Sequence, residues 1–222
     1  MGAQIAVIVS AYNEAERLAD TLAALREAFP DARVLVADDH SDDATPQLAE
    51  AGGAELVRAP RRLGKGGANT LAAQLLMPDP PTLVLCDGDL GSSARRLPRL
   101  VDALARGEGD LAVAAFARRV GGGFGIALGF ARRAIRRLTG IDARAPISGQ
   151  RALRPEVVRA VVPFARGFGM EIGMTVDAHR AGFRLVEVEL ELEHRATGRS
   201  AAGFAHRLRQ LLDFARVYAA RR

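Results

Sequence analysis

The stretch LVLCDGD, residues 83–89, decides how this chain of 222 residues folds. Its apolar residues follow the pair Pro80-Pro81 and stop at two acids, Asp87 and Asp89, that a single glycine separates. A short apolar run between turn residues is typical of a buried central strand. The acids then lie at the carboxyl edge of a sheet, which is where open α/β sheets bind their ligands.

Asp87 and Asp89 allow two interpretations. Asp-Gly is a common turn pair, so both acids can be solvated turn residues. Alternatively, a divalent metal holds them together and carries a phosphorylated ligand, because two carboxylates repel each other and Mg²⁺ or Mn²⁺ takes oxygen ligands. Residues at the other strand ends are needed to distinguish these interpretations.

The first half of the chain alternates strands and helices. We expect strands at residues 5–10, 33–37 and 55–58, and each precedes a segment with apolar residues at helical spacing. With the central strand, this makes four strand–loop–helix units. The pattern predicts one α/β domain with a mainly parallel, Rossmann-like central sheet and helices on both faces.

The second half alternates less regularly. Strands are expected at residues 110–116, 147–153 and 183–192, and the last of these alternates strictly between apolar and acidic residues. Helices are expected near residues 169–181 and over 204–218. The final helix is amphipathic, with an arginine-rich face opposite its apolar face.

Positive charge is concentrated at the carboxyl end. Residues 195–222 contain seven arginines and one acid, a net charge of +6, whereas the whole chain carries +5. A predicted helix adds a basic stripe formed by the arginines at positions 132, 133, 136 and 137. These surfaces suit peripheral contact with the inner face of an anionic membrane. They are equally compatible with solvated helix faces in an arginine-rich protein.

Composition excludes several classes of protein. No apolar run approaches the roughly 20 residues that a membrane-spanning helix needs, and no secretory signal follows Met1, so we expect a cytoplasmic protein. The single cysteine, Cys86, lies within the apolar strand and is expected to fill the core. Two tyrosines and no tryptophan leave little for stacking on nucleic acid, so we expect no nucleic-acid partner.

The loops after parallel strands meet at one edge, and their residues fit a nucleotide site. Tyr12 can stack on a base and Asp39 can accept a hydrogen bond from a base N–H. Lys65, the only lysine, stands among glycines where backbone amides and its own charge can meet a phosphate. The ordinary alternatives are packing for Tyr12, a cap or turn for Asp39 and a plain turn around Lys65.

Six motifs run in one order through nearly the whole chain. They are IVSAYNE (8–14), DDHSDDAT (38–45), GKGGA (64–68), DGD (87–89), SGQRAL (148–153) and HRATGRS (194–200). In these motifs the chain resembles the GT-A-fold glycosyltransferases of family 2, especially the dolichyl-phosphate-mannose-synthase-like enzymes. The resemblance implies a single GT-A domain, with a nucleotide-binding half (1–106), an acceptor half (107–200) and a basic amphipathic C-terminal helix (201–222).

The resemblance implies a metal site for Mg²⁺ or Mn²⁺. Asp87 and Asp89 correspond to the DxD motif of the family, in which the second carboxylate binds the metal directly. The first usually touches the ribose or a metal-bound water. His194 would be the third protein ligand.

The resemblance also implies a donor site for a nucleoside-diphosphate sugar. Tyr12, Glu14 and Asp39 would hold its base and ribose. Lys65 and Arg195 would meet its diphosphate.

Further substrate contacts are implied for Ser148, Gly149 and Gln150. A second likeness, to glucosyl-3-phosphoglycerate-synthase-type transferases, rests on residues 168–173 and on His194. It makes Glu171 the candidate catalytic base.

We therefore expect a metal-dependent glycosyltransferase whose acceptor is a polyprenyl phosphate or a small hydroxyl-bearing or phosphorylated molecule. A phosphate acceptor is already nucleophilic and needs no base, so the role of Glu171 depends on the acceptor. Two alternatives stay open: a haloacid-dehalogenase-like phosphatase, which also has an apolar strand ending in Asp-x-Asp, and a non-catalytic nucleotide-sugar-binding module. The first is disfavoured because its acids follow the first strand of the chain.

Overall fold

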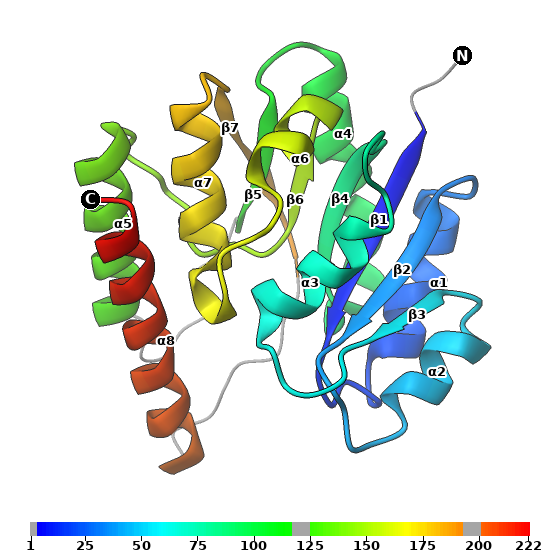
Figure 1. Cartoon of the computed structure of the whole chain (residues 1–222). Helices are drawn as coiled ribbons and strands as arrows, with labels where there is room; N and C mark the ends of the chain where they lie inside the picture. Colours follow the sequence, from blue (N-terminus) through cyan, green and yellow to red (C-terminus); the bar gives the residue numbers. More distant parts are fainter. Residues whose placement is uncertain (1–3, 117–124, 193–200) are drawn as a thin grey trace.

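A computed structural model describes residues 4–116, 125–192 and 201–222, and it has the predicted α/β architecture (Figure 1). Within these residues, seven strands form one sheet. The strands are β1 (Ile5–Ala11), β2 (Arg33–Asp38), β3 (Glu55–Arg58), β4 (Thr82–Asp87), β5 (Leu111–Phe116), β6 (Arg151–Leu153) and β7 (Leu185–Leu190). The α-helices are α1 (Leu18–Ala28), α2 (Thr45–Ala51), α3 (Lys65–Gln74), α4 (Pro98–Ala105), α5 (Gly125–Thr139), α6 (Pro155–Val161), α7 (Met170–Arg180) and α8 (Ala201–Ala220). Two 3₁₀ helices, η1 (Gly91–Arg96) and η2 (Gly167–Gly169), precede α4 and α7.

The strand order is β3-β2-β1-β4-β6-β5-β7. All pairs are parallel except those of β6, which runs antiparallel to both of its neighbours, β4 and β5. In the register of the parallel half, Ser10 on β1 pairs with Asp87 on β4, and Ala11 pairs with Asp38 on β2. The strand ends that carry the predicted site residues therefore meet at one edge, as the sequence predicts.

Alternating side chains of the sheet fill two apolar cores. On β1, Val7 and Val9 face the core covered by α1, α2 and α4, whereas Ala6 and Ile8 face the core covered by α3, α6 and α7. All four side chains are fully buried, which explains why β1 and β4 read as continuous apolar runs. Helices thus cover both faces of the sheet.

A third apolar cluster lies on the far side of α7 from the sheet, where α5 and α8 pack against this helix (Figure 1). Its centre is Phe214 of α8, which is fully buried and stacks on Phe130 of α5 at 6.5 Å between ring centroids. The predicted amphipathic helix at the carboxyl end is therefore part of the fold. No helix in the described residues is both long and apolar enough to cross a membrane.

One local prediction was wrong, and one helix was not predicted. The strand expected at 147–153 contains only Arg151–Leu153, because the residues before it form a loop held by the buried side chain of Arg151. Helix α6 was not predicted, because its sequence, PEVVRAV, is rich in valine, which favours strands. Val157, Val158 and Val161 share the buried face of this short helix, so burial outweighs the local preference.

Candidate functional site

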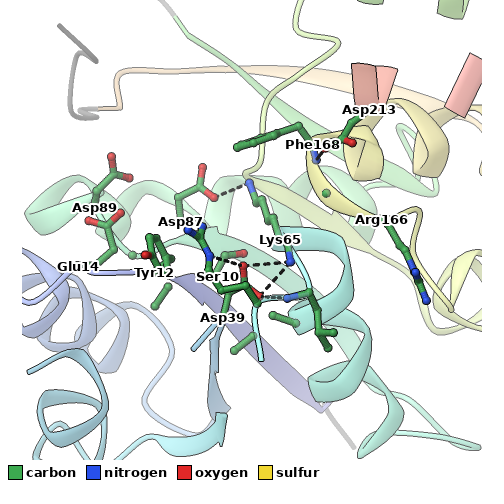
Figure 2. Close-up of a pocket in the computed structure, with 18 of the residues that line it drawn as sticks. Ser10, Tyr12, Glu14, Asp39, Lys65, Asp87, Asp89, Arg166, Phe168 and Asp213 are labelled. Atoms are coloured by element: carbon green, nitrogen blue, oxygen red, sulfur yellow. Dashed lines mark hydrogen bonds and ion pairs between the residues drawn. The ribbon is translucent and has the colours of Figure 1, made fainter. Parts of the chain in front are cut away.

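The strand ends open into a cavity of about 1410 Å³. One wall comes from the ends of β1, β2 and β4 and from the start of α3; the other comes from η2 and α8 (Figure 2). Of the residues predicted to form the site, Tyr12, Glu14, Asp39, Lys65, Asp87 and Asp89 all line this cavity. The structure thus brings together six side chains that the sequence places on four separate segments.

Lys65 lies between two carboxylates. Its Nζ is 2.6 Å from Oδ1 of Asp87 and 2.8 Å from Oε1 of Glu171, in the first turn of α7. Burial alone would lower the pKa of Lys65, but the negative charges of Asp87 and Glu171 outweigh burial and raise that pKa above its usual value. Lys65 therefore stays charged and neutralises part of the acidic cluster.

The loop before β6 completes the surroundings of Asp87. Gln150 donates a hydrogen bond from Nε2 to Oδ2 of Asp87 at 2.7 Å, and Oγ of Ser148 lies 3.2 Å from Oε1 of Gln150. A Cβ on Gly149 would lie 2.4 Å from Nζ of Lys65 and 2.7 Å from Oδ2 of Asp87, so only glycine fits there. Gln150 therefore contacts Asp87 directly, Gly149 lies against it and Ser148 contacts Gln150, although none of the three is among the residues that line the cavity.

Asp39 organises the loop that leads to Lys65. Its carboxylate is 5% exposed and accepts hydrogen bonds from the backbone N–H groups of Leu63, at 2.6 Å, and Gly64, at 3.0 Å. The neighbouring Asp38 is fully buried, accepts from Ser41 and lies 3.3 Å from the guanidinium of Arg58. Asp38 thus has a structural role, while Asp39 is at the cavity wall.

The glycines around Lys65 serve close packing as well as a turn. Gly64 has a φ of +76°, which favours glycine, and a Cβ there would lie 2.9 Å from Cα of Gly167. A Cβ on Gly66 would lie 1.8 Å from the carbonyl oxygen of Ala165. The start of α3 therefore lies directly against the segment that leads into η2, which joins the two walls of the cavity.

The ring of Tyr12 is in contact with an arginine that the sequence did not predict there. The guanidinium carbon of Arg62 lies 3.6 Å from the centroid of the Tyr12 ring, within cation–π distance. Both residues line the cavity. The aromatic face that the sequence assigned to a base is therefore covered by an arginine of the neighbouring loop.

Asp89 and Glu14 lie at the turn after β4. A Cβ on Gly88, between the two acids, would be 3.3 Å from Cγ of Glu14, so Glu14 packs on this turn. Helix α1 holds the turn: Thr21 donates to the carbonyl of Gly88 at 2.8 Å, and Arg17 donates to the carbonyl of Asp89 at 3.1 Å. The backbone around Asp89 is therefore held in place by hydrogen bonds from Arg17 and Thr21.

The predicted metal site is only partly described. Asp87 and Asp89 supply the hard oxygen ligands that Mg²⁺ or Mn²⁺ prefers, and this donor chemistry fits such an ion. His194 and Arg195 lie outside the described residues. Within 4–116, 125–192 and 201–222, no three acidic, histidine or cysteine side chains come close enough to hold a metal by themselves.

The wall opposite the strand ends combines charge and apolar surface. Arg166, Phe168, Leu212 and Arg216 line it, and Leu212 is 48% exposed despite its size. Asp213 ties the wall together, because its carboxylate accepts from the backbone N–H of Phe168 at 3.2 Å and from Arg216 at 3.1 Å. Figure 2 shows Arg166, Phe168 and Asp213 across the cavity from Asp89 and Glu14.

Sequence reasoning missed the arginines of this site. Arg62, Arg166 and Arg216 stand among 30 arginines, so their type alone carries no signal. The spacing of Leu212 and Arg216, one helical turn apart on α8, was available from the sequence. Nothing in it indicated that this face of the last helix closes a cavity formed by the first half of the chain.

Comparisons with known proteins agree with this geometry. The family model "Glycosyl transferase family 2" matches residues 6–162. An undecaprenyl-phosphate mannosyltransferase from Micrococcus luteus is 32% identical over 214 residues, covering 89% of this chain and 86% of that protein. A polyprenol monophosphomannose synthase from Mycolicibacterium smegmatis is 31% identical over 212 residues, covering 86% and 78%.

Among solved structures, glucosyl-3-phosphoglycerate synthase from Mycobacterium tuberculosis is similar throughout. Its complex with phosphoglyceric acid has a TM-score of 0.78 at 26% identity, covering 98% of this chain and 81% of that one. Its complex with Mn²⁺, UDP-glucose and phosphoglyceric acid has the same TM-score at 27% identity, covering 98% and 80%.

The fold is that of the GT-A glycosyltransferases. The chain belongs to glycosyl transferase family 2, and the protein is a glycosyltransferase. This membership disfavours the phosphatase alternative, and Asp87 and Asp89 also follow β4 and not the first strand.

Proposed function

We propose that the protein transfers a sugar from a nucleoside-diphosphate sugar to an acceptor that carries a phosphate group, with Mg²⁺ or Mn²⁺ as cofactor. One observation carries the proposal: the Asp87 and Asp89 pair and the Arg166 and Arg216 pair line the same cavity from opposite walls. The carboxylates suit a metal-bound diphosphate, and the guanidinium groups suit a second phosphate.

The donor occupies the wall made by the strand ends. Tyr12 and Asp39 contact the base, and Glu14 contacts the ribose. Lys65 begins α3, so its charge and the positive end of that helix both face the diphosphate. Ser148, Gly149 and Gln150 act by holding Asp87 in place.

Asp89 would be the direct ligand of the metal, with Asp87 beside it and His194 as a third protein ligand, while Arg195 would reach the diphosphate. When bound, the metal neutralises charge that develops on the leaving diphosphate. Asp87 already accepts hydrogen bonds from Lys65 and Gln150, which favours a contact to ribose or to a metal-bound water over direct ligation.

Glu171 stays a proposed catalytic residue, but its position favours a role in positioning Lys65 over a role as a base. Its carboxylate is 5% exposed and ion-paired with Lys65, so it holds the lysine against Asp87. A phosphate acceptor needs no base, and this agrees with a carboxylate engaged in positioning.

Two observations support an acceptor with a phosphate. One sequence relative is named an undecaprenyl-phosphate mannosyltransferase and another a polyprenol monophosphomannose synthase, and the structural neighbour was solved in complex with phosphoglyceric acid. Beside Arg166 and Arg216, the exposed Leu212 adds apolar surface, which favours a lipid phosphate over a small polar acid. The exposed arginines of α5 would then let the protein dock at the inner face of an anionic membrane.

The test is a thermal-shift screen of UDP- and GDP-sugars with and without Mn²⁺, followed by transfer assays. A donor present at about 100 times its Kd stabilises the protein by about 2.7 kcal/mol, or roughly 5–10 °C in Tm. Undecaprenyl phosphate and 3-phosphoglycerate then serve as acceptors, with the glycosylated product measured by mass spectrometry. Binding of donor and metal without transfer to either would favour the binding module, and no metal-dependent shift with any donor would contradict the proposal.

A further inference from the structure

Arg62 occupies the space that a base needs on Tyr12. Its guanidinium carbon lies 3.6 Å from the ring centroid, whereas an aromatic ring stacked there would have its centroid roughly 4.5–7 Å away. Arg62 and Tyr12 line the same cavity. A base that stacks on this face must therefore displace the guanidinium.

The same side chain also faces the second base contact. Nε of Arg62 is 3.9 Å from Oδ2 of Asp39. Oδ1 of Asp39 accepts from the backbone N–H groups of Leu63 and Gly64, and Oδ2 accepts from that of Gly64 alone, at 3.0 Å. Arg62 thus lies across the ring of Tyr12 and beside Oδ2, the oxygen of Asp39 that has fewer backbone donors and that a base N–H would approach.

The hold on Arg62 is weak enough to be broken by a ligand. Its side chain is 51% exposed, and its distance to Asp39 is at the limit of an ion pair. A cation–π contact at an exposed position changes an equilibrium constant by about two- to fivefold. A phosphate is a stronger partner, because arginine binds it through two parallel charge-assisted hydrogen bonds.

We propose that Arg62 makes the base site selective for phosphorylated nucleotides. When a donor binds, the guanidinium of Arg62 leaves the ring of Tyr12 and binds the diphosphate of the donor. A nucleoside without phosphates must displace Arg62 and has no anionic group that the displaced guanidinium can bind. A nucleoside diphosphate displaces it and supplies the new partner within the same cavity. This inference rests on the proposed function, because it takes Tyr12 and Asp39 as the base contacts.

The chain offers a direct readout of Tyr12. It has no tryptophan and two tyrosines, so in a Tyr218→Phe background the tyrosine fluorescence reports on Tyr12 alone. In that background, uridine and guanosine are titrated against UDP and GDP in the presence of Mn²⁺. Arg62→Ala is compared with Arg61→Ala, which removes an equal charge from the adjacent exposed residue outside the cavity.

The expected result is a change of preference. Arg62→Ala should bind the nucleoside about two- to fivefold more tightly and the nucleoside diphosphate several times more weakly, while Arg61→Ala changes neither. Arg62→Lys keeps the charge without the planar group that forms two parallel hydrogen bonds, so it should bind the nucleoside more tightly and bind the diphosphate with an affinity between those of the parent and Arg62→Ala. Circular dichroism confirms that each variant is folded.

Two outcomes overturn the inference while leaving the proposed function in place. If Arg62→Ala weakens nucleoside binding, Arg62 stacks on the base and does not compete with it. If the ratio of the two affinities is unchanged, Arg62 has no part in selection. If the parent protein binds no nucleotide with Mn²⁺, both the inference and the proposed function fail.

Discussion

The two acids of the DGD turn have different surroundings. Both carboxylate oxygens of Asp87 accept from protein donors, Lys65 and Gln150, while Asp89 is presented on a turn whose backbone Arg17 and Thr21 hold. A substitution at Asp87 therefore disturbs the site even without ligand. One at Asp89 tests the metal contact more cleanly.

Asp89→Ala should abolish metal-dependent transfer and leave the fold intact. Loss of a group that stabilises developing charge costs about 100-fold or more in rate, and Asp89 is partly exposed, so its removal empties no core. The measurement is the rate of sugar transfer at saturating Mn²⁺, with circular dichroism as a check on folding. Asp42→Ala, at an exposed acid outside the cavity, should retain full activity. Full activity in Asp89→Ala would show that the site is assigned wrongly.

Cys86 should be inert in the folded protein. It is fully buried in β4, and burial, together with the charges of Asp87 and Asp89, raises the pKa of its thiol well above the usual value. The reactive thiolate is therefore absent between pH 7 and 9. Iodoacetamide should add no mass to native protein over this range and should modify one cysteine after unfolding in guanidinium. Modification of the native protein at pH 8 would contradict the buried position.

At the scale of elements, loops between strands and helices are tied to one another by single side chains. Asp43, just before α2, accepts from the N–H of Thr45 at 2.9 Å and from the N–H of Ala15 at 3.2 Å. It thereby joins the start of α2 to the loop that carries Tyr12 and Glu14. The shape of the base site depends on this connection.

Asp43→Ala should lower the free energy of unfolding by about 1–3 kcal/mol at pH 7, because two hydrogen bonds to a charged acceptor are lost. Burial would raise the pKa of Asp43, but hydrogen bonds from the side chain and N–H of Thr45 and from the N–H of Ala15 outweigh it and lower the pKa below its usual 3.8. The stabilisation is thus fully present above pH 3.8 and is lost as the pH falls through the folded-state value. In denaturant titrations, the difference in stability between the two proteins should shrink as the pH falls below 3.8, with Asp42→Ala as the control. A difference that persists unchanged at low pH would contradict this account.

The short strand β6 depends on a buried arginine. Arg151 is 1% exposed and donates to the carbonyls of Ser148, at 2.9 Å, and Pro146, at 3.3 Å, and to Oγ1 of Thr175, at 2.9 Å. Burial lowers its pKa to about 10, against the attraction of Glu171 and Glu187, so it remains charged at pH 7. Its contacts shape the loop that delivers Gln150 to Asp87.

Arg151→Met should cost about 2–4 kcal/mol of stability, because three buried acceptors lose their donors. The matched control is Arg99→Met, at an exposed arginine. Donor affinity should also fall, since Gln150 loses its support. Urea denaturation and the thermal shift with donor and Mn²⁺ measure the two effects. A variant as stable as the parent would show that the loop holds its shape without the guanidinium.

At the scale of the molecule, α8 adds a second wall to the site at the sheet edge. It packs against α5 and α7 through Phe214 and faces the strand ends with Leu212 and Arg216. Helix α5, which carries the exposed Arg133 and Arg137, packs beside α8 (Figure 1). Helix α5 thus borders the helix that supplies the second wall of the cavity.

Reversal of charge on α5 should weaken membrane binding. Each basic residue near an anionic bilayer contributes about 1 kcal/mol, so the double variant Arg133→Glu and Arg137→Glu should bind at least about tenfold more weakly. The measurement is co-sedimentation with phosphatidylglycerol vesicles at low and high salt, with neutral phosphatidylcholine vesicles for comparison. The double variant Arg61→Glu and Arg99→Glu, at two exposed arginines outside α5, controls for net charge. Equal binding of all three proteins would mean that α5 is simply solvated.

The sequence by itself determined the parts of the protein that local patterns specify. Apolar runs that end at Asp39 and Asp87 predicted the parallel strands and the edge where they meet, because side-chain period and turn residues act over a few neighbouring positions. The six residues expected at that edge do line one cavity.

Tertiary structure alone decided how these residues pair. Gln150 reaches Asp87 across 63 residues because β6 inserts antiparallel beside β4, and Lys65 meets Glu171 because α7 starts against α3. The contact of Arg62 with Tyr12 and the position of Arg216 on the opposite wall are likewise determined only by the tertiary structure. Such contacts depend on how distant elements pack to bury their apolar faces, and no local pattern in the chain records that choice.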